Sequence, residues 1–164
     1  MLNIRVTDLI RPSRAIIVVV SLFFLLPLLS GYGSLLFPET IQASPENISE
    51  IRSIGKVVAE TEESAHWKNT TQVWNILVIN TEAVSIDDAM TTTISRLNGQ
   101  GWKVVANQSD WTQMRSPRWG YALLTLWPWQ IYSRSQASIS MRTTLDDAQF
   151  APEALVVAEI SIGG

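Results

Sequence analysis

The chain has no cysteine and only one histidine among its 164 residues. Without cysteine there can be no disulfide, no thiolate metal ligand, no cysteine nucleophile and no attachment through a lipidated cysteine. The single histidine, His66, leaves any transition-metal site dependent on carboxylates, which is uncommon for zinc. We therefore predict no metal site and no cofactor, and we interpret His66 as an exposed loop residue.

Charge is also scarce, and basic charge is not in excess. Charged residues make up 16% of the chain, below the roughly 25% that is usual in soluble domains. The net charge is −3, and no basic tract is present. The sequence thus lacks the electrostatic footprint of a nucleic-acid-binding protein, and we expect no nucleic-acid partner.

Motifs for catalysis are missing as well. The sequence contains no serine nucleophile elbow, phosphate-binding loop, dinucleotide glycine pattern or zinc-protease motif. Two acidic pairs remain, Asp87-Asp88 and Asp146-Asp147, and a helix N-terminus and a turn explain them. We predict no catalytic residue and no enzyme activity. A hydrolase whose carboxylates converge only in the folded protein is the alternative.

What the chain does contain is one long apolar run. Residues 15–37 carry no charge, and fifteen of these 23 residues are Ile, Val, Leu or Phe. At about 1.5 Å per residue, a helix of this length covers the roughly 30 Å of bilayer hydrocarbon. The run predicts a transmembrane helix, and the lipid bilayer is the first partner that we expect.

The flanking charges set the orientation of this helix. Arg5, Arg11 and Arg14 precede it against a single Asp8, and the next basic residue is Arg52. The positive-inside rule then places residues 1–14 in the cytoplasm and the rest of the chain outside the cell membrane. The alternative is a cleaved signal peptide, for which the small residues near position 30 would supply the cleavage site and which would release a secreted domain.

Residues 38–70 are polar and acidic, and we predict a stalk or linker there. Pro45 after Ser44 could open a short helix that runs to Arg52, because proline suits the first helical turn. Residues 54–59 could equally form a strand.

A small folded domain is expected from residue 71 to residue 164. Ser85 has the form of a helix N-cap, and the residues that follow it place apolar side chains on one stripe up to the stop at Asn98-Gly99. Strands are predicted over residues 73–79, 102–106, 121–127, 138–144 and 155–162. This pattern predicts an α+β fold with two layers, in which one main helix packs on a sheet of about four strands.

One segment is rich in the residue types that dominate binding interfaces. Trp111, Arg115, Arg118 and Trp119 lie within nine residues, and Trp and Arg are enriched in binding hot spots. We predict a binding loop there; the alternative is that both tryptophans are core residues and that the arginines stack on their edges.

A second aromatic pair, Trp127 and Trp129, could place its rings at the membrane interface. Together these features predict a membrane-anchored outer domain that binds another membrane or envelope protein as an accessory subunit.

Overall fold

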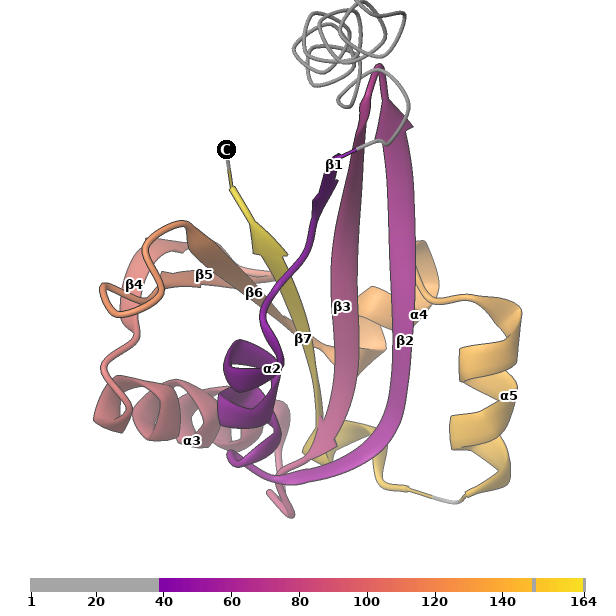
Figure 1. The fold of residues 1–164 in the computed structure, drawn as a ribbon. Helices are drawn as coiled ribbons and strands as arrows, with labels where there is room; N and C mark the ends of the chain where they lie inside the picture. The colour runs from indigo at the N-terminus through magenta and orange to yellow at the C-terminus, as the bar shows by residue number, and fades with distance from the viewer. Residues whose placement is uncertain (1–38, 149, 164) are drawn as a thin grey trace, which may run out of the picture. The chain divides into compact units, whose positions relative to one another are not determined.

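The computed structural model describes residues 39–148 and 150–163, which form a seven-stranded sheet with α-helices on both faces (Figure 1). The strands are β1 (Glu39–Ile41), β2 (Lys56–Trp67), β3 (Thr70–Asn80), β4 (Lys103–Asn107), β5 (Thr112–Arg115), β6 (Ala122–Pro128) and β7 (Leu155–Ile162). The helices are α2 (Pro45–Arg52), α3 (Ile86–Gly99), α4 (Trp129–Ser135) and α5 (Ile139–Asp147), and a short 3-10 helix covers Pro152–Ala154. The chain from Thr40 onward makes up one compact unit.

The last strand in the sequence lies in the middle of the sheet. The strand order is β1-β3-β7-β6-β5-β4, and β2 pairs with the other edge of β3. β7 therefore joins β3 to β6, and its pairing with both strands is antiparallel. β3 and β4, which the sequence connects through α3, are not neighbours.

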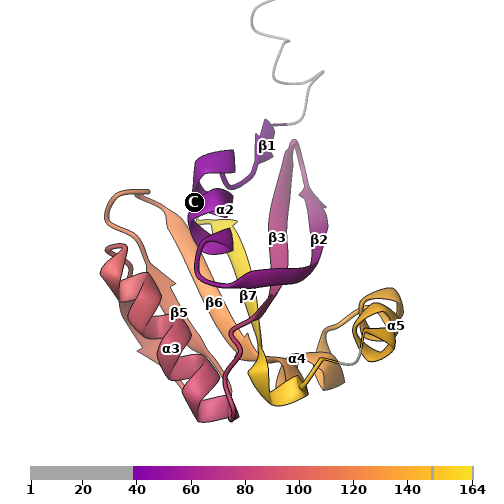
Figure 2. The ribbon, with the colours of Figure 1, turned by 90° about the horizontal axis from the view of Figure 1, so that it is seen from below.

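Each face of the sheet has its own apolar core, because successive residues of a strand point to opposite sides. On the first face α2 and α3 cover β3, β7 and β6 (Figure 2). The buried residues of this core are Ala43, Ile48, Ile51, Ile54, Leu77, Ile79, Ala89, Leu97, Trp102, Met114, Ala122, Leu124, Leu126, Val156, Ala158 and Ile160. On the second face α4 and α5 contribute to a smaller core, formed by Ile76, Val78, Trp129, Tyr132, Ala137, Met141, Leu145, Leu155 and Val157.

The helix predicted after Ser85 is confirmed as α3, and both of its ends follow capping rules. The Ser85 hydroxyl accepts a hydrogen bond from the Asp88 backbone N–H at 3.2 Å, as an N-cap residue does. At the other end Gly101 adopts φ 98°, and the Trp102 N–H donates to the Leu97 carbonyl at 3.0 Å. This is the Schellman geometry that a glycine after the helix permits. It turns the chain so that Trp102 enters the core directly.

The predicted strands at residues 73–79, 102–106, 121–127 and 155–162 are confirmed as β3, β4, β6 and β7. The short helix that Pro45 could open is α2, and the Ser44 hydroxyl accepts a hydrogen bond from the Asn47 N–H at 3.3 Å. Most of the segment predicted as a polar stalk thus lies in β1, α2 and β2.

The predicted two-layer domain with one main helix and about four strands is wrong. The described residues contain four α-helices and seven strands, and helices on both faces make three layers. The prediction failed because β2 is polar on both faces and because β5 lies inside the segment that was interpreted as a binding loop.

The predicted strand at residues 138–144 is wrong as well, because this segment begins α5. The Ser138 hydroxyl accepts a hydrogen bond from the Met141 N–H at 3.2 Å and so caps the helix. Met141 and Leu145, four residues apart, are the buried side chains, while Ile139 is 83% exposed. The alternation of Ile139 and Met141 is too short to separate a period of two from a period of 3.6.

The predicted transmembrane segment, residues 15–37, lies outside the described residues. Within residues 39–148 and 150–163, no helix has the length and apolar character needed to cross a bilayer.

Candidate functional site

The predicted Trp/Arg binding loop is divided by a strand. β5 occupies Thr112–Arg115, so Trp111 precedes the strand and Trp119 lies in the turn between β5 and β6. Trp111 is half-buried against Trp127, with 6.2 Å between the ring centroids. Trp119 is half-buried against the first core, near α2. The four predicted residues therefore do not form one surface.

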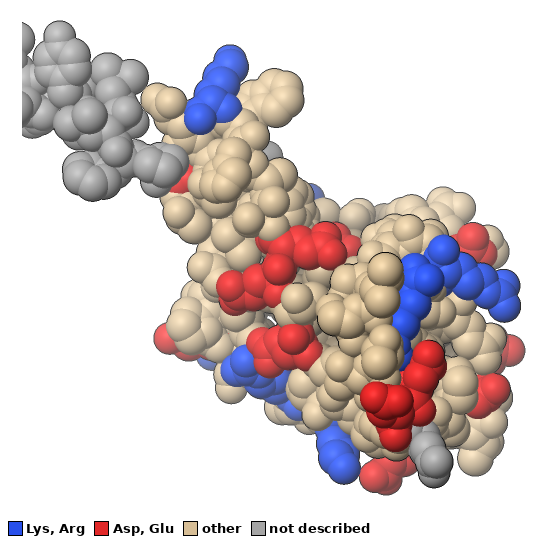
Figure 3. Space-filling model, turned by 90° about the vertical axis from the view of Figure 1, so that its right-hand side faces the viewer, with Lys and Arg blue, Asp and Glu red and all other residues tan. Residues whose placement is uncertain are grey.

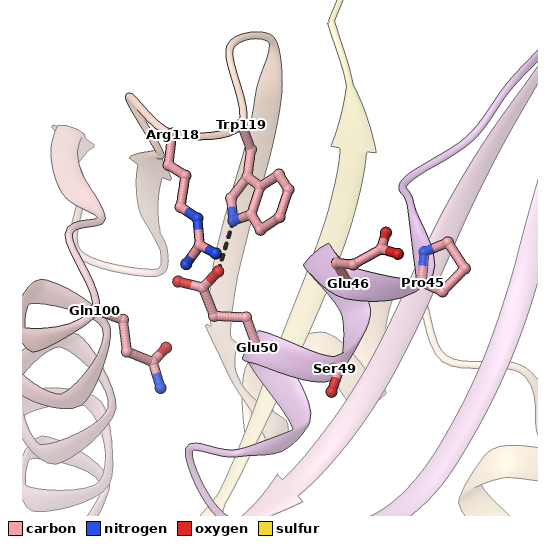
Figure 4. A pocket seen from close by; sticks show the side chains of 7 residues that line it. All are labelled: Pro45, Glu46, Ser49, Glu50, Gln100, Arg118 and Trp119. Carbon is pink, nitrogen blue, oxygen red and sulfur yellow. Dashed lines mark hydrogen bonds between the residues drawn. The ribbon is translucent and has the colours of Figure 1, made fainter.

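Arg118 and Trp119 do line a cavity of about 520 Å³ (Figure 4). Three separate parts of the chain build it: α2, the end of α3 and the β5–β6 turn. The remaining lining residues are Pro45, Glu46, Ser49, Glu50 and Gln100. Arg115 is exposed on β5 and is not part of this lining.

The local structure of α2 explains why its polar side chains face the cavity. The helix buries Ile48 and Ile51 against the sheet. Glu46, Ser49 and Glu50 follow the i, i+3, i+4 spacing that places side chains on one face of a helix. Of the three side chains, Glu50 points toward Arg118 and Trp119 in the β5–β6 turn, as Figure 4 shows.

Glu50 is the centre of a hydrogen-bond network. The Trp119 Nε1–H donates to Glu50 Oε2 at 2.5 Å, and the Trp102 Nε1–H donates to Glu50 Oε1 at 3.3 Å. Trp102 is fully buried, so its indole donor has a fixed position. The carboxylate joins α2 to the end of α3 and to the β5–β6 turn, and it holds the Trp119 ring in place.

The Trp119 ring in turn supports Arg118. The guanidinium carbon of Arg118 lies 4.7 Å from the Trp119 ring centroid, within the range of a cation–π interaction. Among the described residues, no hydrogen bond or ion pair is formed by Arg118; the one ion pair there joins Arg52 to Glu60. The guanidinium donors at the mouth of the cavity are therefore open to a ligand.

Acceptor groups surround the rest of the cavity. The pKa of Glu46 is lowered by hydrogen bonds from its own backbone N–H and from Ser44, so this exposed carboxylate is ionised at neutral pH. The Gln100 amide donates to Ser53 Oγ at 2.8 Å, and its buried oxygen has no partner among the described residues. The cavity thus offers one cationic donor group, Arg118, and one exposed carboxylate, Glu46.

A second group of titratable side chains lies on the other face of the sheet. Burial raises the pKa of Glu159 on β7, and the charge of Glu63 raises it further. Burial also raises the pKa of Tyr132, with smaller contributions from Glu159 and Glu63. None of these three residues lines the cavity of Figure 4.

The other residues considered from the sequence lie elsewhere. Trp129 is 6% exposed in the second core, so its ring is not presented at the surface, and Trp127 is half-buried beside it. His66 is exposed, as predicted, but it lies on β2 and not in a loop, and its Nδ1 lies 2.8 Å from Thr71 Oγ1. Within the described part of the chain, no three His, Asp or Glu side chains are grouped as metal ligands.

Asp87 and Asp88 occupy the first turn of α3, as expected. Asp146 and Asp147, expected in a turn, lie in the last turn of α5 and are exposed.

Comparisons of the chain with protein-family models, with curated proteins and with solved structures found no match. Of the residues that line the cavity, Arg118 and Trp119 were predicted from the sequence as binding residues, whereas Glu46, Ser49, Glu50 and Gln100 were not. The only sequence signal for Glu46, Ser49 and Glu50 was the Ser44-Pro45 helix start. No local pattern reveals that a carboxylate will meet indoles 52 and 69 residues further along the chain.

Proposed function

We propose that this chain is a membrane-anchored outer domain without catalytic activity, and that it binds an extended peptide segment of another membrane or envelope protein in the Arg118–Trp119 cavity. The observation that carries this proposal is the open guanidinium of Arg118, stacked on an indole that Glu50 holds in position.

A fixed guanidinium is well suited to recognition. Its planar fork matches a carboxylate or a carbonyl oxygen, and stacking removes part of the side-chain freedom that binding would otherwise cost. The Glu46 carboxylate, which also lines the cavity, suits N–H donors or an ammonium group. A peptide backbone, which carries donors and acceptors at close spacing, satisfies both sides.

In this proposal the Glu50 carboxylate has a structural role and not a catalytic one. Both of its oxygens already accept indole N–H groups. Such an arrangement orients neighbouring side chains and leaves the carboxylate less available to a reacting substrate. The proposed attachment to the membrane rests on residues 15–37 and on the arginines before them.

The proposal is tested by photo-crosslinking in the membranes of cells that produce the protein. A photoreactive amino acid replaces Ser49 at the cavity, and a matched control replaces Thr143, which is exposed on α5. We expect a specific adduct from position 49 and none from position 143.

The crosslinking is repeated with Arg118→Ala and, as a control arginine outside the cavity, with Arg115→Ala. Loss of a hot-spot arginine lowers affinity by about thirty-fold, or about 2 kcal/mol, so the adduct should disappear only with Arg118→Ala. An adduct that persists in Arg118→Ala, or that is lost equally in both variants, would contradict the proposed site.

A further inference from the structure

The β2–β3 hairpin extends beyond the body of the sheet. β2 pairs with β3 along the whole of Thr70–Asn80, whereas β7 pairs with β3 only over Asn75–Asn80. The side chains from Glu62 to Asn69 are exposed. In Figure 3 this part of the hairpin forms an arm at the upper left of the molecule.

The end of this arm carries an aromatic and a cationic residue. Trp67 is 75% exposed and forms the last strand pair with Thr70, and Lys68 follows it in the turn. Lys68 adopts φ 53°, in the left-handed region that glycine or asparagine occupies at lower cost. The two-residue turn of a hairpin requires a positive φ at its first position, so the turn itself accounts for the backbone of Lys68. The turn places the side chains of Trp67 and Lys68 at the end of the arm.

Within the hairpin itself, acidic residues lie away from the tip. Residues 64–72 contain no Asp or Glu, whereas Glu60, Glu62 and Glu63 lie further down β2. Figure 3 shows most of the acidic side chains of this face nearer the body and a basic group at the far end of the arm. This distribution suits an anionic lipid surface, which attracts lysine and repels carboxylates.

β1 shows where the preceding chain reaches the domain. Since β2 and β7 occupy the other positions beside β3, β1 can pair only with the part of β3 before Asn75, toward the tip. The Gln42 amide donates to Glu62 Oε1 at 3.2 Å, and Glu62 is opposite Asn75 in the hairpin. Gln42 is therefore level with Asn75, and the β1 residues before it, the exposed Glu39 included, lie closer to the tip.

The rise per residue of the chain relates the tip to the predicted membrane segment. Thr40 is two residues before Gln42, so it is three residues short of the level of Thr70. At about 3.3 Å per residue, this corresponds to about 10 Å along the hairpin. Phe37, the last residue of the apolar run, is three residues before Thr40 and can be at most about 11 Å from it. The link between Thr40 and the apolar run is thus long enough to cover the remaining distance along the hairpin to its tip.

We propose that the hairpin tip, through Trp67 and Lys68, rests in the headgroup layer of the bilayer that the chain's own N-terminal segment enters. This inference depends on the membrane anchor of the proposed function. Tryptophan favours the interface because its ring is apolar and its N–H is polar, and lysine adds attraction to anionic headgroups. The contact gives the domain a fixed orientation on the membrane.

The absence of natural cysteines allows a direct test. The full chain carrying Asn69→Cys is labelled with an environment-sensitive fluorophore and reconstituted into vesicles of phosphatidylcholine with a minority of phosphatidylglycerol. A lipid with a nitroxide at the headgroup serves as quencher. The matched control carries the same label at Ile139→Cys, which is exposed on α5. Flotation of the vesicles after carbonate treatment shows in parallel whether the chain is anchored.

We expect quenching at position 69 to exceed that at position 139 by at least about two-fold, and to fall when Trp67→Ala and Lys68→Glu are added. Equal quenching at the two positions in an anchored chain overturns the inference and leaves the anchor intact. A chain that does not float overturns the anchor and the inference together. Protection of position 69 in cell membranes but not in lipid vesicles assigns the tip to a protein partner, and so also overturns the inference.

Discussion

Glu50 and Glu159 are both half-buried carboxylates, but the hydrogen-bond donors and charges around them differ. Glu50 accepts hydrogen bonds from two indole N–H groups and connects three parts of the chain. Glu159 faces Glu63 and Tyr132, and its carboxylate accepts no hydrogen bond from any other described residue. The first carboxylate therefore stabilises its surroundings, whereas burial and the charge of Glu63 make ionisation of the second unfavourable.

The raised pKa of Glu159 makes the stability of the domain depend on pH. The native protein holds this proton at pH values where the unfolded chain has lost it, so stability falls as the pH rises from the ordinary carboxyl range through the raised pKa. We predict that Glu159→Gln raises the melting temperature at about pH 7 and has little effect at about pH 4, where both states are largely protonated. Circular dichroism melts at the two pH values measure this difference.

Glu82→Gln, at an exposed loop position, is the control and should melt like the parent protein at both pH values. A lower melting temperature of Glu159→Gln at about pH 7 would show that the ionised carboxylate has a partner and stabilises the fold.

At the scale of whole elements, the sequence predicted best where a segment is apolar or capped in a characteristic way. β3 and β7 are continuous apolar runs because both faces of these central strands are covered, and their positions were predicted to within a few residues. α3 was recognised from Ser85 at one end and the glycines at the other.

The elements that were not predicted have sequences that do not indicate their secondary structure. β2 carries Glu60, Glu62 and Glu63 because much of it projects into solvent, so its composition resembles that of a linker. α5 was interpreted as a strand because its few apolar residues fit both periods. The position of β7 between β3 and β6 depends on contacts that are distant in sequence, which local patterns do not encode.

The first elements of the domain should be required for folding. Residues 71–164 lack α2 and β2, so the edge of β3 would lose its partner and the first core would lose Ile48, Ile51 and Ile54. Removing buried aliphatic side chains costs about 2 to 5 kcal/mol each, which together exceeds the stability of an ordinary domain. We predict that residues 40–164 fold cooperatively and that residues 71–164 do not.

Amide spectra and urea unfolding of the two fragments measure this difference. A dispersed spectrum and a cooperative transition for residues 71–164 would show that α2 and β2 are accessory to the fold.

At the scale of the whole molecule, the N-terminal apolar segment and the binding cavity have separate roles in the proposed function. In that proposal the segment holds the domain at the membrane, and the cavity lined by α2 and the β5–β6 turn contacts the partner. Of the site, the sequence predicted Arg118 and Trp119 as binding residues. It could not predict that they meet α2, because that meeting depends on the folded core.

The most direct test of this account is the topology of the full chain in intact cells. Because the chain has no natural cysteine, Asn3→Cys and Ile139→Cys each provide one reactive thiol, before and after the apolar segment. We predict that the full-length chain remains in the membrane after carbonate extraction. A membrane-impermeant maleimide should label position 139 on intact cells and position 3 only after permeabilisation. Recovery of a soluble chain that begins near residue 34, or labelling of position 3 from outside, would contradict the account.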